Sequence, residues 1–203
     1  VPHSDVDPFS IQEVKSFLEN IRPDFKNYYA TRFFTGARTA EVDGLQWKYV
    51  DFERRQILIR ETLVDYVLET TKTPGSVREI HMSQMVYDAL INQFEATGSQ
   101  SEFVFCNKKG NPLRHRDVSK RIWYPALRYM GLKSRKPYQT RHTAATLWLA
   151  SGENPEWIAR QMGHTTTRML FTVYSRFVPN LTRKDGSAFE RLMITTMKGD
   201  DHE

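Results

Sequence analysis

The sequence has only one cysteine, Cys106, among its 203 residues. A single thiol excludes an internal disulfide and a cysteine-rich zinc site, and it is typical of a protein kept in a reducing compartment. No apolar run approaches the roughly 20 residues needed to span a bilayer, and the first residues do not resemble a signal peptide. These absences predict a cytoplasmic protein without a membrane partner.

Two common phosphate chemistries also lack their motifs. The chain has no glycine-rich loop and no GK[ST] sequence, so nucleotide hydrolysis is not indicated. Its six histidines are scattered, no HExxH sequence is present, and the carboxylates do not cluster with the histidines. We therefore expect neither a metal site nor a cofactor.

What is present indicates one globular domain. Hydrophobic residues make up 39% of the chain, which contains 12 Phe, nine Tyr and four Trp. A chain of this length can bury a sizeable core. The sequence begins at Val1 with the polar stretch PHSDVDP, and we expect another domain to precede this one in the whole protein.

The positive charge is concentrated in one segment. Residues 108–141 contain eleven Lys and Arg against one acid, so this segment carries +10 and the remainder −5 of the net +5. Aromatic residues lie among these charges, a composition that favours a polyanion such as nucleic acid over a merely solvated face. The candidate DNA-binding residues are Lys120, Arg121, Arg128, Lys133, Arg135 and Lys136.

Local patterns predict an α+β fold that is mainly α-helical with a small antiparallel sheet. A capping box, Ser10 to Glu13, begins one helix, and a second runs from Pro23 to Gly36. A short third helix follows in residues 37–47. The β-rich stretches and later helices lie, in order, at 56–63 (strand), 78–82 (strand), 83–96 (helix), 102–105 (strand), 117–131 (helix, with Pro125 inside or breaking it) and 140–177 (three helices).

Two arginines occupy positions suited to binding one phosphate. Arg38 comes just before the third helix, and Arg141 lies in the first turn of another helix, whose positive dipole end also favours an anion. The planar guanidinium donates paired hydrogen bonds to phosphate oxygens. Either arginine alone is more typical of a salt-bridge partner.

Five stretches occur in the order and approximate spacing of the catalytic domain of the tyrosine recombinase, or phage integrase, family. They are TGARTAEVDGLQW, TKTPGSVREIHM, YQTRHTAAT, ARQMGH and TVYSRF. Each is weak alone, but together they resemble that family from about Ser10 to Phe177. The resemblance implies residues 1–177 as an integrase-type catalytic domain, residues 178–203 as a tail with a candidate docking helix, and an N-terminal DNA-binding domain outside this sequence.

The resemblance also assigns roles to particular residues. Arg38 and Arg141 correspond to the phosphate clamp, Lys72 to the lysine of the hairpin and His164 to the late histidine. Tyr174 corresponds to the nucleophile. The acidic residue that braces this site in the family is matched by Glu41.

One position departs from the family pattern. The family usually has histidine three residues before the second arginine, where this chain has Tyr138. A phenol can donate a hydrogen bond to a phosphate oxygen, but with a reference pKa near ~10 it carries protons poorly at neutral pH. We therefore expect Tyr138 to keep phosphate binding, and the acid–base help of that histidine is in doubt.

Tyr174 could be either core or nucleophile from its helical spacing alone. His164 and Tyr174 are ten positions apart, about 15 Å along one straight helix, which would keep them from reaching one phosphate. Gly163 and the threonines after it predict a helix stop and a new start. With the five stretches, this break favours Tyr174 as nucleophile, whereas we expect His142 to be a structural histidine under the site.

The function predicted is a site-specific DNA recombinase that cuts and rejoins duplex DNA through a 3′-phosphotyrosine. We expect a homo-oligomer, a tetramer, on DNA, with a monomer in isolation left open, in a bacterial or phage-encoded protein associated with the nucleoid. A DNA-binding module without catalysis and a type IB topoisomerase-like enzyme remain alternatives. In the tail, Phe189, Leu192 and Met193 form an apolar stripe that could dock on its own domain or on a neighbour.

Overall fold

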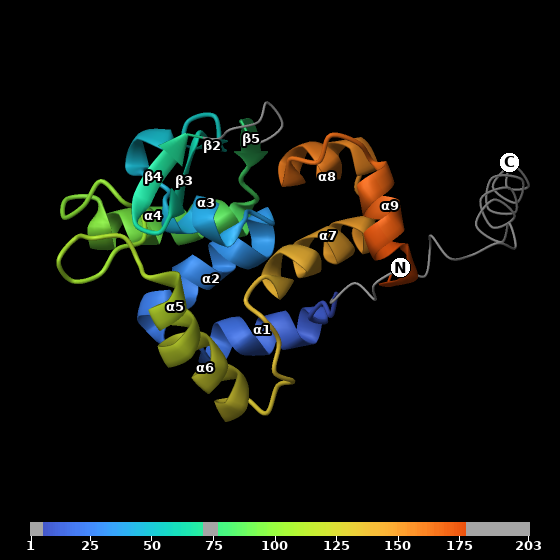
Figure 1. The fold of residues 1–203 in the computed structure, drawn as a ribbon, viewed down its shortest axis with the longest axis horizontal. Helices are drawn as coiled ribbons and strands as arrows, with labels where there is room; N and C mark the ends of the chain where they lie inside the picture. Colours follow the sequence, from blue (N-terminus) through green and yellow to red (C-terminus); the bar gives the residue numbers. More distant parts are fainter. Residues whose placement is uncertain (1–5, 71–76, 178–203) are drawn as a thin grey trace, which may run out of the picture.

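The computed structural model describes residues 6–70 and 77–177. Helices dominate this part of the chain, and the short strands lie together on one side of the helical body (Figure 1). The α-helices are α1 (Ile11–Asn20), α2 (Pro23–Thr35), α3 (Thr39–Asp43), α4 (Gln84–Thr97), α5 (His115–Val118), α6 (Tyr124–Tyr129), α7 (Gln139–Ser151), α8 (Pro155–Met162) and α9 (Arg168–Tyr174). The predicted α+β class is confirmed.

The first helices begin and end where the sequence predicts. Ser10 caps α1 with both hydrogen bonds of a capping box, one of them from Glu13 N to Ser10 Oγ at 3.1 Å. Pro23 begins α2, and Gly36 ends it at a φ of 61°, a left-handed conformation that glycine adopts without steric cost. Local hydrogen-bonding chemistry therefore sets the entry to α3, which begins one residue after Arg38.

The strands differ from the prediction in one respect. The stretch 56–63 is not one strand, because Arg60 separates β2 (Gln56–Ile59) from β3 (Glu61–Val64). Antiparallel β1 (Val50–Asp51), β2 and β5 (Arg78–His81) form one sheet in the order β1-β2-β5, with Ile57 opposite Ile80. A separate hairpin joins β3 to β4 (Val67–Thr70).

The turn of this β3–β4 hairpin was missed in the sequence. Asp65 and Tyr66 have φ values of 47° and 68°, the two left-handed residues that a tight hairpin turn requires. Neither is glycine, so the usual sequence signal is absent. The prediction of a strand at 102–105 is also wrong, since Phe103 pairs with Gln46 only through an isolated β-bridge.

The segment around Pro125 continues as helix by changing its winding. Between α5 and α6 lies a π-helical turn, Ser119–Trp123. Pro125 then falls in the first turn of α6, where a missing N–H costs no helical hydrogen bond. Trp123 is fully buried there, and its indole donates to the Arg135 carbonyl at 2.6 Å.

Two hydrophobic clusters hold the molecule together. The larger one joins α1, α2, α4, α6 and the inner face of the three-stranded sheet, with Phe17, Phe33 and Trp123 packed at its centre. The smaller cluster is formed by α7, α8 and α9, which lie together at the other side of the molecule (Figure 1). Tyr174 belongs to this second cluster and is only 2% exposed.

Candidate active site

The brace of the site is a buried carboxylate, Glu41. It lies in α3 with 1% of its surface exposed and accepts hydrogen bonds from the Arg38 backbone N–H at 2.7 Å and the Arg38 side chain at 3.0 Å. Arg78 donates two further bonds from β5, at 2.7 and 2.8 Å. Burial alone would raise the pKa of Glu41, but the hydrogen bonds and charge of Arg78, together with Arg38, hold it below its ordinary value.

Arg78 was missed as a site residue in the sequence. It occupies the inward face of β5 with Ile80, as the alternating burial of this strand shows, and its Nε donates to the Gln161 carbonyl of α8 at 2.7 Å. The alternation of Arg78, Ile80 and Met82 with polar residues was the available signal, because it predicts an arginine facing the core. Arg78 ties the sheet to both α3 and α8.

We expect Arg78→Met to cost about 3–5 kcal/mol of unfolding free energy, since it leaves a buried carboxylate without its main partner. Urea denaturation measures this loss. The control is Arg54→Met, whose ion pair with Asp51 spans 3.9 Å with the arginine 78% exposed, and which should cost less than about 1 kcal/mol. Equal stability losses in the two variants would show that the Arg78–Glu41 pair is not a brace.

Arg141 joins three segments that are far apart in the sequence. Its guanidinium donates to the carbonyl of Gly36, two residues before Arg38, and to that of Met162 at the end of α8. It also lies 3.4 Å from His164 Nε2. The side chain is buried, which lowers its pKa, but an arginine remains charged at neutral pH. The structure therefore places Arg141 beside His164 and against the turn that leads to Arg38.

His164 is positioned by the end of α8. Gly163 adopts a φ of 68°, and the His164 backbone N–H returns to the Ala159 carbonyl at 2.8 Å, which closes a Schellman motif. Burial, reinforced by the neighbouring charge of Arg141, lowers the pKa of His164 to about 4. The imidazole is therefore neutral at physiological pH and acts there as a hydrogen-bonding group, not as a cation.

The predicted helix break before Tyr174 is present, because α8 ends at Met162 and α9 begins at Arg168. Thr167 precedes α9 but makes no side-chain cap, so the break depends on Gly163. Tyr174 Oη lies 2.8 Å from His142 Nδ1 of α7. Burial raises the pKa of the Tyr174 phenol above its ordinary value.

Tyr138 stands directly before α7 and is 44% exposed. Its ring makes an edge contact with the His142 ring at a centroid distance of 5.1 Å. It also lines an open groove with Thr39 and Lys136, of about 870 Å³. Lys72, the remaining predicted catalytic residue, lies outside the described residues, as do Phe189, Leu192 and Met193 of the tail.

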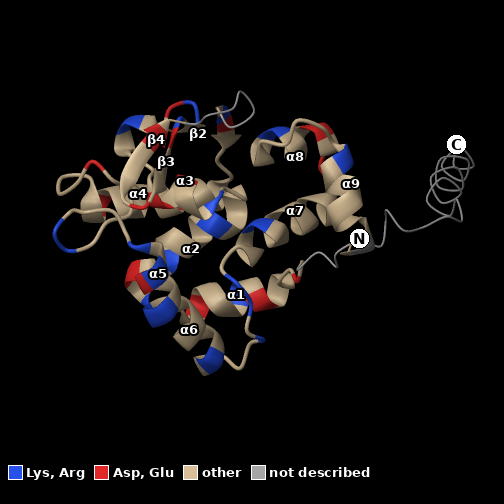
Figure 2. Ribbon diagram, viewed as in Figure 1, with Lys and Arg blue, Asp and Glu red and all other residues tan. Residues whose placement is uncertain are grey.

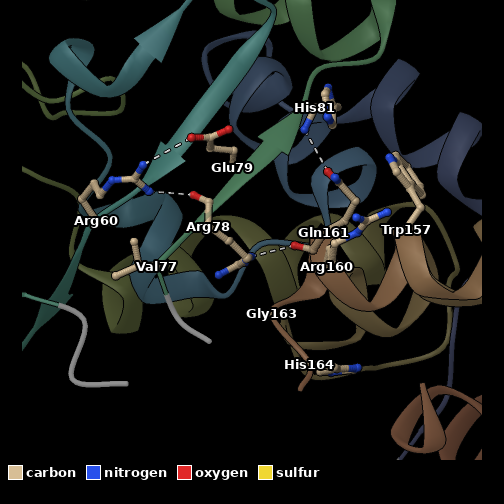
Figure 3. A pocket seen from close by; sticks show the side chains of 10 residues that line it. All are labelled: Arg60, Val77, Arg78, Glu79, His81, Trp157, Arg160, Gln161, Gly163 and His164. Atoms are coloured by element: carbon tan, nitrogen blue, oxygen red, sulfur yellow. Dashed lines mark hydrogen bonds and ion pairs between the residues drawn. The ribbon is translucent and has the colours of Figure 1, made fainter. Parts of the chain in front are cut away.

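A second groove, of about 600 Å³, extends from His164 between β5 and α8 (Figure 3). Arg60 borders it, where its guanidinium donates to the Arg78 carbonyl at 3.0 Å and pairs with Glu79 at 3.6 Å. Gln161 closes the opposite side by accepting from the His81 backbone N–H. The contacts of Gln161 with Arg78 and His81 hold β5 and α8 together beside the site.

The basic segment divides into an exposed part and a structural part. Lys and Arg gather on α5, α6 and the segment leading to α7 (Figure 2). Lys120, Arg121 and Arg128 are exposed, and Lys120, Arg128 and Lys136 border the groove that contains Tyr138. The DNA-binding assignments of these four remain predictions.

The other two candidates, Arg135 and Lys133, are paired with acidic residues, and the assignment of Lys133 remains a prediction. Arg135 is not a surface cation, because its side chain is 8% exposed, pairs with Glu13 at 2.9 Å and lies over the Phe9 ring. It anchors α1 to the segment before α7, so we withdraw it from the DNA-binding candidates. Lys133 is exposed but pairs with Asp7 at 2.7 Å, which reduces the charge it offers to a polyanion.

Comparison with known proteins gives this arrangement a family. A model of the phage integrase family matches residues 9–179. The chain belongs to the phage integrase family. The integrase match covers all the described site residues from Arg38 to Tyr174, so the resemblance seen in the five sequence stretches is confirmed.

Several relatives of this integrase chain are similar over most of its length. It is 28% identical to Prophage integrase IntR of Escherichia coli (strain K12), over 86% of this chain and 48% of that protein. It is 30% identical to the transposase from transposon Tn916 of Enterococcus faecalis, over 70% of this chain and 39% of that protein. The integrase chain thus spans about half or less of the length of these relatives.

The fold agrees with a solved structure of the Tn1549 transposon integrase in complex with a circular intermediate DNA. The TM-score is 0.80 at 22% identity, over 95% of this chain and 67% of that one. Within residues 6–70 and 77–177, no helix is long and apolar enough to cross a membrane. No three His, Cys, Asp or Glu side chains in those ranges lie close enough together to hold a metal ion.

Proposed function

We propose that this chain is the catalytic domain of a site-specific DNA recombinase that cuts and rejoins DNA through a 3′-phosphotyrosine. The observation that carries the proposal is the arrangement around Arg141, whose guanidinium contacts the segment before Arg38 and lies beside His164. The hydroxyl of Tyr174, at the end of α9, lies against His142, which follows Arg141 in α7. Two arginines, a neutral imidazole and a phenol are a consistent set for phosphodiester chemistry.

The residues divide the work as follows. Arg38 keeps 37% of its side chain exposed although it pairs with Glu41, so its guanidinium can reach a phosphate from solvent. Backbone carbonyls take two of the five N–H groups of Arg141 and a third faces His164, so the remaining two can serve a second phosphate oxygen. His164 adds a neutral donor. These groups stabilise the charge that develops on the phosphate oxygens during attack.

The covalent intermediate explains why rejoining requires no nucleotide. Attack by Tyr174 Oη on phosphorus forms an oxygen–phosphorus bond as the bond to the 5′-oxygen breaks. The phosphotyrosine ester conserves the energy of the cleaved bond, so a 5′-hydroxyl can reverse the reaction. Lys72 would supply the proton that the departing 5′-oxygen needs.

The partners follow from the same chemistry. Exchange of strands between two duplexes requires four cleavages with one tyrosine each, so we propose a tetramer assembled on duplex DNA. The protein would act on DNA in the bacterial nucleoid. Neither a metal nor a cofactor is needed by this scheme.

The test of the function is a nicked suicide substrate, from which the cut fragment diffuses away and traps the covalent protein–DNA adduct on a denaturing gel. Because the chain covers about half of its relatives' length, the test uses the full-length protein. Exchange between paired sites would distinguish a recombinase from a relaxing topoisomerase, which acts on a single duplex. Binding without an adduct would leave the DNA-binding module as the remaining reading.

We expect DNA affinity to depend on the exposed basic surface. Changing both Lys120 and Arg128 to Gln should weaken binding to all sequences alike and flatten the slope of log affinity against log salt by about one unit per lost phosphate contact. Changing both Lys15 and Lys26 to Gln is the charge-matched control, because these residues border an apolar cleft formed with α4 instead. An unchanged slope in the first variant would show that this surface faces away from DNA.

A further inference from the structure

The hydroxyl of Tyr174 is held by the imidazole of His142. The distance between Tyr174 Oη and His142 Nδ1 is 2.8 Å, and the two rings are 5.6 Å apart. The two residues come from helices α9 and α7, which lie against each other (Figure 1). Tyr174 is 2% exposed, so this hydroxyl faces a protein group and not bulk water.

The direction of this hydrogen bond follows from the need of a buried phenol to donate its proton. Among the residues that the structure describes, His142 Nδ1 is the recorded acceptor within hydrogen-bond distance of Tyr174 Oη. The phenol then donates and Nδ1 accepts, which places the imidazole proton on Nε2. In this tautomer the nucleophile is already in contact with a group that can take its proton.

The other candidate bases near the site are held elsewhere. Glu41 accepts hydrogen bonds from Arg38 and Arg78, and its depressed pKa makes it a weak base. His164 has its Nε2 directed at Arg141, 3.4 Å away, and its own pKa of about 4 also indicates a weak base. Their hydrogen-bond partners are arginines, whereas His142 Nδ1 lies against the nucleophile.

We propose that His142 is a catalytic residue, the general base that accepts the proton of Tyr174 during DNA cleavage. The O–H bond of the phenol breaks and its proton passes to His142 Nδ1, while the phenol oxygen bonds to phosphorus and the bond to the 5′-oxygen breaks. In rejoining, the 5′-hydroxyl gives its proton back to the proposed general acid, Lys72, and its oxygen bonds to phosphorus, while the bond between phosphorus and the phenol oxygen breaks and the departing phenolate recovers the proton from His142. This inference rests on the proposed recombinase function.

The ring of Tyr138 fixes the orientation of this base. Its edge contact with His142 at 5.1 Å, at an interplanar angle of 74°, places the imidazole between two phenol rings. Tyr138 stands directly before α7, where the family usually has a histidine, and the base proposed here lies four residues later, within α7. Tyr138 is thus a positioning residue for His142.

The experiment measures single-turnover cleavage of the suicide substrate by His142→Asn, in the full-length protein. Loss of the base should slow cleavage by ~10²–10⁴-fold. The same variant is then prepared with a fluorinated tyrosine at position 174, whose more acidic phenol needs less help from a base. Two proteins are then compared, both with fluorotyrosine at position 174, one with His142 and one with His142→Asn. The cleavage rate of the second should be less than about tenfold below that of the first.

The controls separate this role from packing. His81→Asn removes an exposed histidine whose recorded hydrogen bond is made by its backbone amide, and it should cleave at the wild-type rate. His142→Gln provides a second variant, and a thermal melt of each reports folding. In protein that keeps His142, the fluorotyrosine at position 174 should make the cleavage rate fall less steeply as the pH is lowered.

Each outcome decides between distinct conclusions. Equal defects with tyrosine and with fluorotyrosine would assign His142 to packing, and a variant that cleaves at the wild-type rate would remove the proposal altogether. Either result, with an adduct formed by wild-type protein, would leave the recombinase function standing. Failure of the wild-type protein to form any adduct would overturn both.

Discussion

Tyr174→Phe should form no covalent adduct with a nicked suicide substrate, while it folds and binds DNA as the wild type does. The change removes only the oxygen that would bond to phosphorus. The ring stays packed in the cluster of α7, α8 and α9. Loss of the hydrogen bond to His142 should cost about 0.5–1.5 kcal/mol of stability, too little to unfold the domain.

A denaturing gel and a thermal melt measure the two expectations together. The control is Tyr87→Phe, which also removes one hydroxyl, but from a tyrosine on α4 that packs edge-on against Phe52. It should form the adduct as the wild type does. An adduct that persists in Tyr174→Phe would show that Tyr174 is not the nucleophile.

Lys72→Ala should slow cleavage of an ordinary DNA strand by ~10²–10⁴-fold, the effect typical of losing a general acid. The 5′-oxygen is a poor leaving group unless a proton reaches it as the bond to phosphorus breaks. A substrate with sulfur at the bridging 5′ position leaves without protonation. Most of the rate of Lys72→Ala should therefore return on that substrate.

Lys48→Ala is the matched control, because Lys48 is an exposed lysine just before β1, where it pairs with Glu61 at 3.6 Å. Its cleavage rates should equal those of the wild type on both substrates. If Lys72→Ala shows the same defect with oxygen and with sulfur, the lysine binds DNA and does not donate the proton.

Helix ends in this protein could be predicted because their signals are local. The capping box of Ser10 and Glu13, Pro23 at a helix start and Gly36 and Gly163 at helix ends each act through groups within a few residues. Strand pairing is not local, and there the prediction was less accurate. Arg60 divides what looked like one strand because its two halves pair with different partners, β5 and β4.

In the basic segment, the sequence likewise does not predict which charged side chains are exposed. A run of lysines and arginines indicates a polyanion partner, but the run alone does not say which of them face solvent. Arg135 has the same sequence surroundings as Lys133 and Lys136, yet it is buried against Glu13 and Phe9. Only the packing of α1 against the segment before α7 decides this.

The sequence by itself determined the family, the helical class and the order of the site residues, because these depend on residue types and their spacing. The tertiary structure decided which groups touch. Glu41 meets Arg78 across 37 positions, and His142 meets Tyr174 across 32. Such contacts depend on how the sheet and α7, α8 and α9 pack. Burial then lowers the pKa of His164 and raises that of Tyr174, whereas Arg78 and Arg38 hold the pKa of the buried Glu41 below its ordinary value. No periodicity along the chain encodes that packing.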